Sequence, residues 1–397
     1  MTGSKAFAAV LRLQVESGTE GPSTPEGKFL AMALCLFPEV TSGMLSNRSR
    51  LFSCVQISPF LGARAYQDLE NCQWIQGGRF YPRINESRRG TKHIDAMRAL
   101  LNGYPKQAQD WLVQYPEKGL SVKNRLLLAI LLDREELGGR LRPTSFGDLV
   151  KLTGFSPNQV KVQLQKLKEI GVVSGVVPGV TGISVFGIAK SYIYLNLLHP
   201  FWSCFFPDWR AICLDTSLWQ DASTEKDLYP LVGELISVEL GRRPELKRYF
   251  HNLVLMLISD ILSRYWHELR LNNLSSILQV EEYFAEKLLR VELSVSDFPW
   301  FIFRVADIAG QIQEELFKGN RGLTEFVGET SWGFCVLPAF SVHSQPLVIL
   351  TNCRGISSGI DSTWLRANGH ARWIEVGLVT RPDAAPIKLR SCKSKLL

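Results

Sequence analysis

The side chains with the clearest capacity for recognition lie close together in the middle of the chain. They are carboxamides and ammonium groups between Ser156 and Lys166, namely Asn158, Gln159, Lys161, Gln165 and Lys166. A carboxamide both donates and accepts hydrogen bonds, and an ammonium group donates up to three. The set is therefore suited to binding a polar or charged partner through hydrogen bonds.

No pattern in the sequence predicts catalysis or a cofactor. The phosphate-binding pattern GxxxxGK[ST] is absent, as are GxGxxG, GxSxG, HExxH and the EF-hand loop. The 8 cysteines and 6 histidines are scattered, without the close ligand pairs of a zinc site. We therefore expect a protein that is not an enzyme, with no catalytic residue, no metal and no cofactor, and with buried, reduced thiols.

The composition predicts packed domains in a cytoplasmic protein. Hydrophobic residues make up 46% of the chain and charged residues 21%, which argues against global disorder. The net charge of +7 is compatible with a polyanionic partner but does not require one. The N-terminus lacks the features of a signal peptide, and no apolar run reaches the ~20 residues of a membrane span. We therefore expect no membrane contact.

Two predicted helices precede the polar cluster. The first covers Val122–Glu136, and its core-facing stripe consists of Leu126, Leu127, Ile130 and Leu131, with Lys123, Arg125, Asp133 and Glu135 mainly off it. A polar, basic loop, LGGRLRP, follows. In the second helix Thr144 or Ser145 can cap the start, and Asp148 has the spacing of a capping box with Ser145. Gly154 is suited to end this helix.

A third predicted helix carries the polar cluster itself. Ser156 is a good N-cap, and Pro157 suits the first helical position. The helix runs from Pro157 to Ile170, and its buried face consists of Val160, Leu164, Leu167 and Ile170. The polar cluster falls outside that stripe. Two β-branched runs about a Pro-Gly turn then predict a hairpin over Val172–Ile188.

The block LVKLTGFSPNQVKVQLQKLKEIGVV resembles the helix-turn-helix core of MarR-type and related bacterial winged-helix regulators. The match consists of L-x-x-L-T-G-x-S, a valine after Pro157, L-x-x-L and I-G-V-V. It covers residues 121–188 only. The resemblance implies a winged helix-turn-helix and a cytoplasmic, bacterial-type regulator of transcription. Such a protein binds double-stranded DNA, commonly as a homodimer.

The resemblance also implies roles for individual side chains. A recognition helix enters the major groove, where Asn or Gln pairs with adenine, Lys reaches guanine, and Val162 can contact a thymine methyl group. Near the preceding helix, Ser145, Arg140 and Arg142 are positioned to hold phosphates. The expected DNA-binding residues are therefore Arg140, Arg142, Ser145, Ser156, Asn158, Gln159, Lys161, Val162, Gln165 and Lys166.

The predicted hairpin departs from this family, because no residue between Glu169 and Lys190 is charged. A second departure is Val150, where a smaller residue is common. We therefore expect the hairpin to pack on the rest of the protein. The positive charge that contacts the DNA backbone would then come from Arg79–Lys92, from the tail after Pro386 or from a second subunit. The stretch Arg79–Lys92 has the composition of a basic arm, and also that of an ordinary solvated loop, which is the commoner case.

The expected fold is mainly α with small β elements. Residues 1–118 form an N-terminal region of unknown role, with a helix at Lys28–Phe37, and residues 119–190 form the winged helix. Residues 191–330 form a helical domain for dimerisation or for a protein or ligand partner, and residues 331–397 a β-rich end with a basic tail. Residues 191–330 contain aromatic side chains that are expected to form a core rather than a ligand pocket. They are Trp202, Phe205, Phe206, Trp209, Trp300, Phe301 and Phe303.

One alternative function stays open at this point. Winged helices also serve as protein-protein modules, because a fold does not determine its use. The protein would then be an interaction component of a larger complex, such as a mobile-element or defence assembly, with the winged helix as a scaffold.

Overall fold

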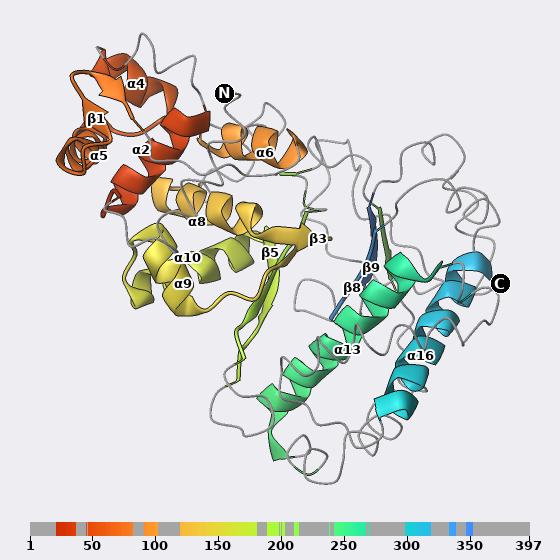
Figure 1. The fold of residues 1–397 in the computed structure, drawn as a ribbon. Helices are drawn as coiled ribbons and strands as arrows, with labels where there is room; N and C mark the ends of the chain where they lie inside the picture. The colour runs from red at the N-terminus through yellow and green to blue at the C-terminus, as the bar shows by residue number, and fades with distance from the viewer. Residues whose placement is uncertain are drawn as a thin grey trace, which may run out of the picture. The chain divides into compact units, whose positions relative to one another are not determined.

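The structure is a computed structural model that describes residues 21–36, 45, 47–81, 91–101, 120–180, 189–197, 199, 201–202, 210–213, 238, 242–266, 269, 298–318, 333–338 and 347–351. The chain divides into two compact units (Figure 1). The first comprises Met1–Val173 and Tyr194–Pro207, and the second Ser174–Ile193 and Asp208–Leu397. The described part is mostly helical with small antiparallel sheets, as the sequence predicts.

Among the described residues, the first unit begins with four helices, two of which pack on α8 (Val122–Asp133). They are α2 (Pro25–Leu36), α4 (Arg48–Cys54), α5 (Pro59–Asn71) and α6 (Thr91–Leu101), with a hairpin of β1 (Ile75–Gln76) and β2 (Arg79–Phe80) after α5. Helix α2 packs against α5, α6 and α8. The structure therefore places these N-terminal helices in the same unit as residues 119–173, whereas the predicted division separated them.

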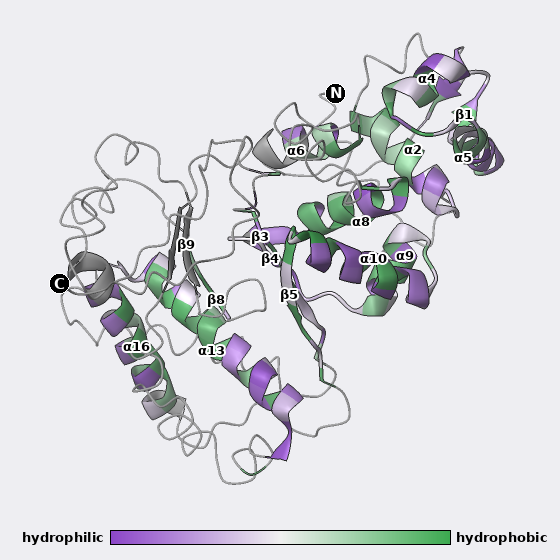
Figure 2. Cartoon of the chain, turned by 180° about the vertical axis from the view of Figure 1, so that it is seen from behind, coloured by the Kyte–Doolittle hydropathy of each residue, from purple (hydrophilic) through white to green (hydrophobic). Residues whose placement is uncertain are grey.

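Helix α8 is buried on all sides rather than along one stripe. Every residue from Asn124 to Asp133 is buried, and Figure 2 shows α8 as largely hydrophobic. Arg125, expected mainly off the core stripe, is only 3% exposed. Its guanidinium donates to the carbonyl oxygens of Gln56 at 2.8 Å, Val55 at 3.3 Å and Leu100 at 3.4 Å. The prediction was wrong because these acceptors, all distant in sequence, allow the charge to be buried.

A short hairpin replaces the loop expected after α8. The helix ends at Asp133 rather than Glu136, and β3 (Glu135–Leu137) pairs with β4 (Arg140–Leu141). Gly138 and Gly139 connect the strands with φ of 61° and 88°. Two consecutive positive φ values are typical of a type I′ turn, for which Gly-Gly is a known signal. The sequence LGGRL therefore contained the information for this hairpin.

Helices α9 (Phe146–Thr153) and α10 (Pro157–Ile170) follow the predicted bounds closely. The capping box of Ser145 and Asp148 is present, so that prediction is confirmed. Gly154 and Gly171 end the two helices with φ of 70° and 90°, a conformation that glycine adopts at little cost. The predicted buried face of α10 is also confirmed.

The predicted hairpin about a Pro-Gly turn is wrong. The strand β5 (Val173–Val177) is followed by Pro178 and Gly179, but the chain does not reverse there. Val180 and Ala189 exchange two backbone hydrogen bonds, of 3.0 and 2.9 Å. The returning strand is β6 (Tyr192–Leu195), and the sheet order is β3-β4-β6-β5. Strand β6 lies at the start of residues 191–330, which we had expected to form a helical domain.

The second unit contains two long helices and a three-stranded sheet. The helices are α13 (Pro244–Arg264) and α16 (Phe298–Lys318), and the strands β7 (Arg210–Cys213), β8 (Gly333–Leu337) and β9 (Leu347–Thr351). The antiparallel sheet has the order β7-β9-β8, and α13 packs on both β8 and α16 (Figure 1). Strands β8 and β9 lie in the segment 331–397 that the sequence predicts to be rich in β structure.

The core interpretation of the aromatic residues holds for some of them and fails for one. Trp202 and Phe301 are buried, in the first and the second unit respectively, and Phe303 is half-buried. Trp300 is 68% exposed, so it is not a core residue. Phe205, Phe206 and Trp209 lie outside the described residues. Among the described residues, no helix combines the length and apolar character that a bilayer crossing requires.

Candidate nucleic-acid interface

The outward face of α10 presents a continuous polar stripe with one apolar side chain. Asn158, Lys161, Val162 and Gln165 are exposed and recur at spacings of three, one and three residues, which places them on one side of a helix. Val162 is 62% exposed although it is apolar. Lys166, at the border of the stripe, is half-buried. The opposite face of α10 packs on α8 and α9.

The first turn of α10 is held by its own side chains. The hydroxyl of Ser156 accepts the backbone N–H of Gln159 at 3.3 Å, and Oε1 of Gln159 accepts the backbone N–H of Ser156 at 3.0 Å. These two residues were expected to contact DNA, but they already form a capping box. The spacing S-x-x-Q is typical of a capping box. Our prediction identified Ser156 as the N-cap but did not include Gln159 as its reciprocal partner.

Gln165 is also partly engaged within the helix. Its Nε2 donates to Oε1 of Glu169 at 3.0 Å. This contact lies on the surface, where a hydrogen bond contributes little net free energy and can be exchanged for another partner. Gln165 is therefore an adaptable polar group, and Glu169 adds one negative charge to the C-terminal end of the stripe.

Three residues expected to bind phosphates are buried or make contacts within the protein. Arg140 lies in β4 and is only 6% exposed, so a phosphate group does not have access to it. Arg142 forms an ion pair with Glu136, with 3.1 Å between Nε and Oε1. The hydroxyl of Ser145 accepts the backbone N–H of Asp148 at 3.0 Å. We therefore leave these three residues out of the proposed interface.

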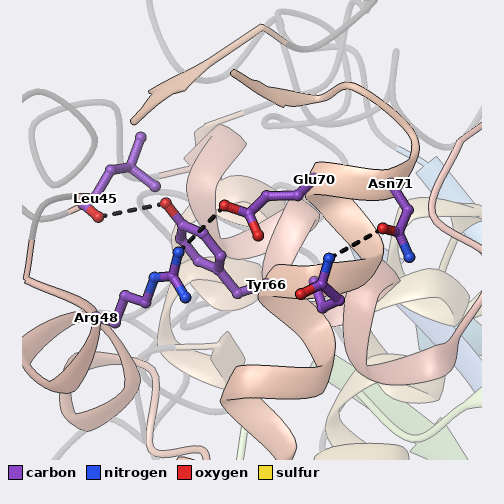
Figure 3. A network of polar contacts seen from close by, with 6 residues as sticks. Leu45, Arg48, Tyr66, Glu70 and Asn71 are labelled. Atoms are coloured by element: carbon purple, nitrogen blue, oxygen red, sulfur yellow. Dashed lines mark hydrogen bonds and ion pairs between the residues drawn. The ribbon is translucent and has the colours of Figure 1, made fainter. Parts of the chain in front are cut away.

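Residues 47–81, which include Arg79 at the start of the predicted basic stretch, form α4, α5 and the β1–β2 hairpin. Nη2 of Arg48 lies 3.2 Å from Oε1 of Glu70, and its guanidinium carbon lies 4.0 Å from the centre of the Tyr66 ring (Figure 3). The Tyr66 hydroxyl in turn donates to the carbonyl oxygen of Leu45. Arg48 therefore ties α4 to α5. Residues 82–90 and the tail after Pro386 lie outside the described residues.

The described residues 174–180 and 189–193 belong to the second unit. Within that unit the rings of Tyr192 and Tyr249 are 5.9 Å apart between centroids. Tyr192 follows the predicted hairpin, whose residues 181–188 lie outside the described part of the chain, so the packing of the hairpin on protein stays a prediction.

Four thiols and the potential metal ligands lie among the described residues. Cys35 and Cys335 are buried, Cys54 and Cys72 are half-buried, and all four are unbridged. Complete burial raises the pKa of the Cys35 thiol, which keeps it protonated. Within the described ranges, no group of three His, Cys, Asp or Glu side chains is arranged to hold a metal ion.

Comparison with known proteins adds no relative. The chain matches no protein-family model, no curated protein and no solved structure. A function is therefore inferred from the chemistry and geometry of α10 and of the elements that hold it.

Proposed function

We propose that residues 120–197 form a winged helix-turn-helix and that the protein binds double-stranded DNA with α10 in the major groove. The observation that carries the proposal is the uncovered stripe of Asn158, Lys161, Val162 and Gln165 on a well-capped helix. The succession of α8, the β3–β4 hairpin, α9, α10 and strands β5 and β6 supports it, since winged helices have this order of elements.

Each group of the stripe matches a feature of the major groove. The carboxamides of Asn158 and Gln165 can donate to N7 and accept from N6 of adenine, and the Lys161 ammonium can donate to O6 and N7 of guanine. Val162 can contact the methyl group of thymine. An exposed valine between polar groups has no evident benefit in water, whereas a methyl contact would bury it.

The stripe carries too little charge to supply the whole affinity. Among exposed groups on its face only Lys161 is cationic, with Lys166 half-buried beside it. We therefore propose a cytoplasmic regulator that binds as a homodimer and contacts two half-sites roughly 34 Å apart, one helical turn of DNA.

The test is a binding assay on duplexes selected by the protein from a random pool. The double variant Lys161→Ala, Gln165→Ala should bind the selected duplex with an affinity lower by at least about 30-fold, because each of the two lost base contacts costs about 1–3 kcal/mol. The slope of log affinity against log salt should also decrease by about one.

The matched control is Arg64→Ala, Gln67→Ala on α5. This pair also removes one cation and one glutamine from an exposed face of the first unit. It should bind as the wild type does. The proposal fails if the folded wild-type protein selects no duplex and binds none at low salt.

A further inference from the structure

We propose that Lys28 and Asp68 are positioning residues that hold the start of α10 in place for DNA. Together they fix residues 23–28, at the beginning of α2, against the turn between α9 and α10. The inference rests on the proposed function of α10, and it assigns a role to N-terminal residues for which the sequence predicted none.

The first contact joins α2 to the end of α9. Lys28 is only 7% exposed, and its Nζ donates to the carbonyl oxygen of Lys151 at 2.7 Å. Lys151 lies in the last turn of α9, where carbonyl groups have no partner within the helix. A cation is also favoured there by the helix dipole. Lys28 therefore acts as a C-terminal cap supplied from another helix.

The second contact is the close approach of the two backbones. A Cβ atom at Gly154 would lie 2.7 Å from the carbonyl oxygen of Ser23 and 3.2 Å from Cε of Lys28. Gly154 is followed by Phe155 and then by Ser156, the N-cap of α10. Because there is no space for a side chain, a movement of residues 23–28 would be transmitted to the turn and to the first residues of α10.

The third contact anchors residues 23–28 to α5. The Asp68 carboxylate accepts the backbone N–H and hydroxyl of Thr24 at 2.8 and 2.7 Å, and those of Ser23 at 3.3 and 3.1 Å. The Thr24 hydroxyl oxygen also accepts the N–H of Gly27 at 3.0 Å. One carboxylate therefore holds four donors, and α5, the start of α2 and the turn form one continuous structure.

This arrangement suits a helix that must read DNA. Side chains that recognise a ligand need to be held within about 0.5 Å and 10–20° of the productive geometry. The polar stripe of α10 starts at Asn158, four residues after Gly154. A shift of the turn would therefore move the base-reading groups while leaving the helix itself intact.

The test uses Asp68→Asn and Lys28→Met, each compared with the wild type on the selected duplex at a temperature where circular dichroism shows every variant folded. Asp68→Asn replaces one acceptor oxygen by a donor, and Lys28→Met keeps the apolar stem but removes the donor. We expect the affinity of each to fall by about tenfold, as for coupling between distant groups. The slope against salt should stay unchanged, because neither residue contacts phosphate.

The controls are Asp95→Asn and Lys123→Met, which change the same residue types at positions of the first unit that are exposed or half-buried. They should bind as the wild type does. The inference is overturned if Asp68→Asn and Lys28→Met also bind as the wild type does. It is equally overturned if they lower the salt slope as Lys161→Ala does, since they would then act on the charge.

Hydrogen exchange gives a readout that does not depend on DNA. The N–H of Gly154 donates to the carbonyl oxygen of Val150, and that of Phe155 to the Thr153 hydroxyl. Exchange at both should be faster in Asp68→Asn and Lys28→Met than in the controls. Unchanged exchange overturns the inference even if the wild type binds DNA. Faster exchange without DNA binding by the wild type supports the positioning of the turn and contradicts the proposed function alone. If Asp68→Asn does not fold, Thr24→Val, which removes one hydroxyl, replaces it.

Discussion

Two buried cations of the first unit are stabilised to different extents. Arg125 donates to three carbonyl oxygens, and its guanidinium carbon lies 4.8 Å from the centre of the Phe29 ring. Lys28 has the carbonyl oxygen of Lys151 at 2.7 Å. Burial lowers the pKa of Lys28 from 10.5 to about 8, because loss of hydration outweighs the attraction of Asp68. The charge of Lys28 therefore costs stability.

This cost predicts a pH dependence of stability. The folded-state pKa of Lys28 is about 8 and its ordinary value 10.5, so the unfolded chain binds more protons between these values. The cost is fully present below pH 8 and disappears as the pH rises towards 10.5. Between about pH 7 and pH 10 the free energy of unfolding should gain on the order of 2 kcal/mol from this group.

Urea unfolding of Lys28→Met at these two pH values measures the effect. The variant should lack the gain, whereas Lys123→Met should keep it. An equal gain in wild type and Lys28→Met would contradict the prediction.

At the scale of elements, two serines of α13 accept hydrogen bonds from β8, at the edge of the three-stranded sheet of the second unit. The Ser259 hydroxyl accepts the N–H of Val336 at 2.8 Å, and the Ser263 hydroxyl accepts that of Phe334 at 2.9 Å. Four residues of a helix rise about 6 Å and two residues of a strand about 6.6 Å, so the two repeats match. Among the described strands β8 is the outermost of its sheet, and these bonds satisfy donors that would otherwise face apolar surface.

Removing both hydroxyls should therefore destabilise the protein markedly. In Ser259→Ala, Ser263→Ala the N–H groups of Phe334 and Val336 lose their partners, at about 1–3 kcal/mol each. Urea unfolding should show this loss, while Gln311→Ala, an exposed change on α16 in the same unit, should be nearly neutral. A double variant as stable as the wild type would show that water replaces the serines.

At the scale of the molecule, residues 119–190 are divided between the two compact units of the chain. Helix α8 is buried on all sides, and α2 and α6 cover part of it. Strands β5 and β6 are also divided between the first and the second unit. A winged helix that folds alone would need only one buried stripe on its first helix.

A fragment of residues 119–190 is accordingly expected not to fold cooperatively. Without α2 and α6 it would expose leucines of α8 and leave Arg125 without its acceptors on Val55, Gln56 and Leu100. Thermal unfolding followed by circular dichroism should show no sharp transition for this fragment, whereas the full chain should show one. A sharp transition of the fragment would restore the predicted boundary.

The sequence by itself determined α9 and α10: their caps, their glycine ends and the buried stripe of α10. These features depend on contacts within about four residues, so local patterns contain them. The β3–β4 turn was equally local, and its Gly-Gly signal was overlooked. Only the tertiary structure decided that Arg125 and Arg140 are buried, that Lys28 supports α9, and that the chain continues past Pro178. Each depends on partners far away in sequence, whose position no local pattern specifies.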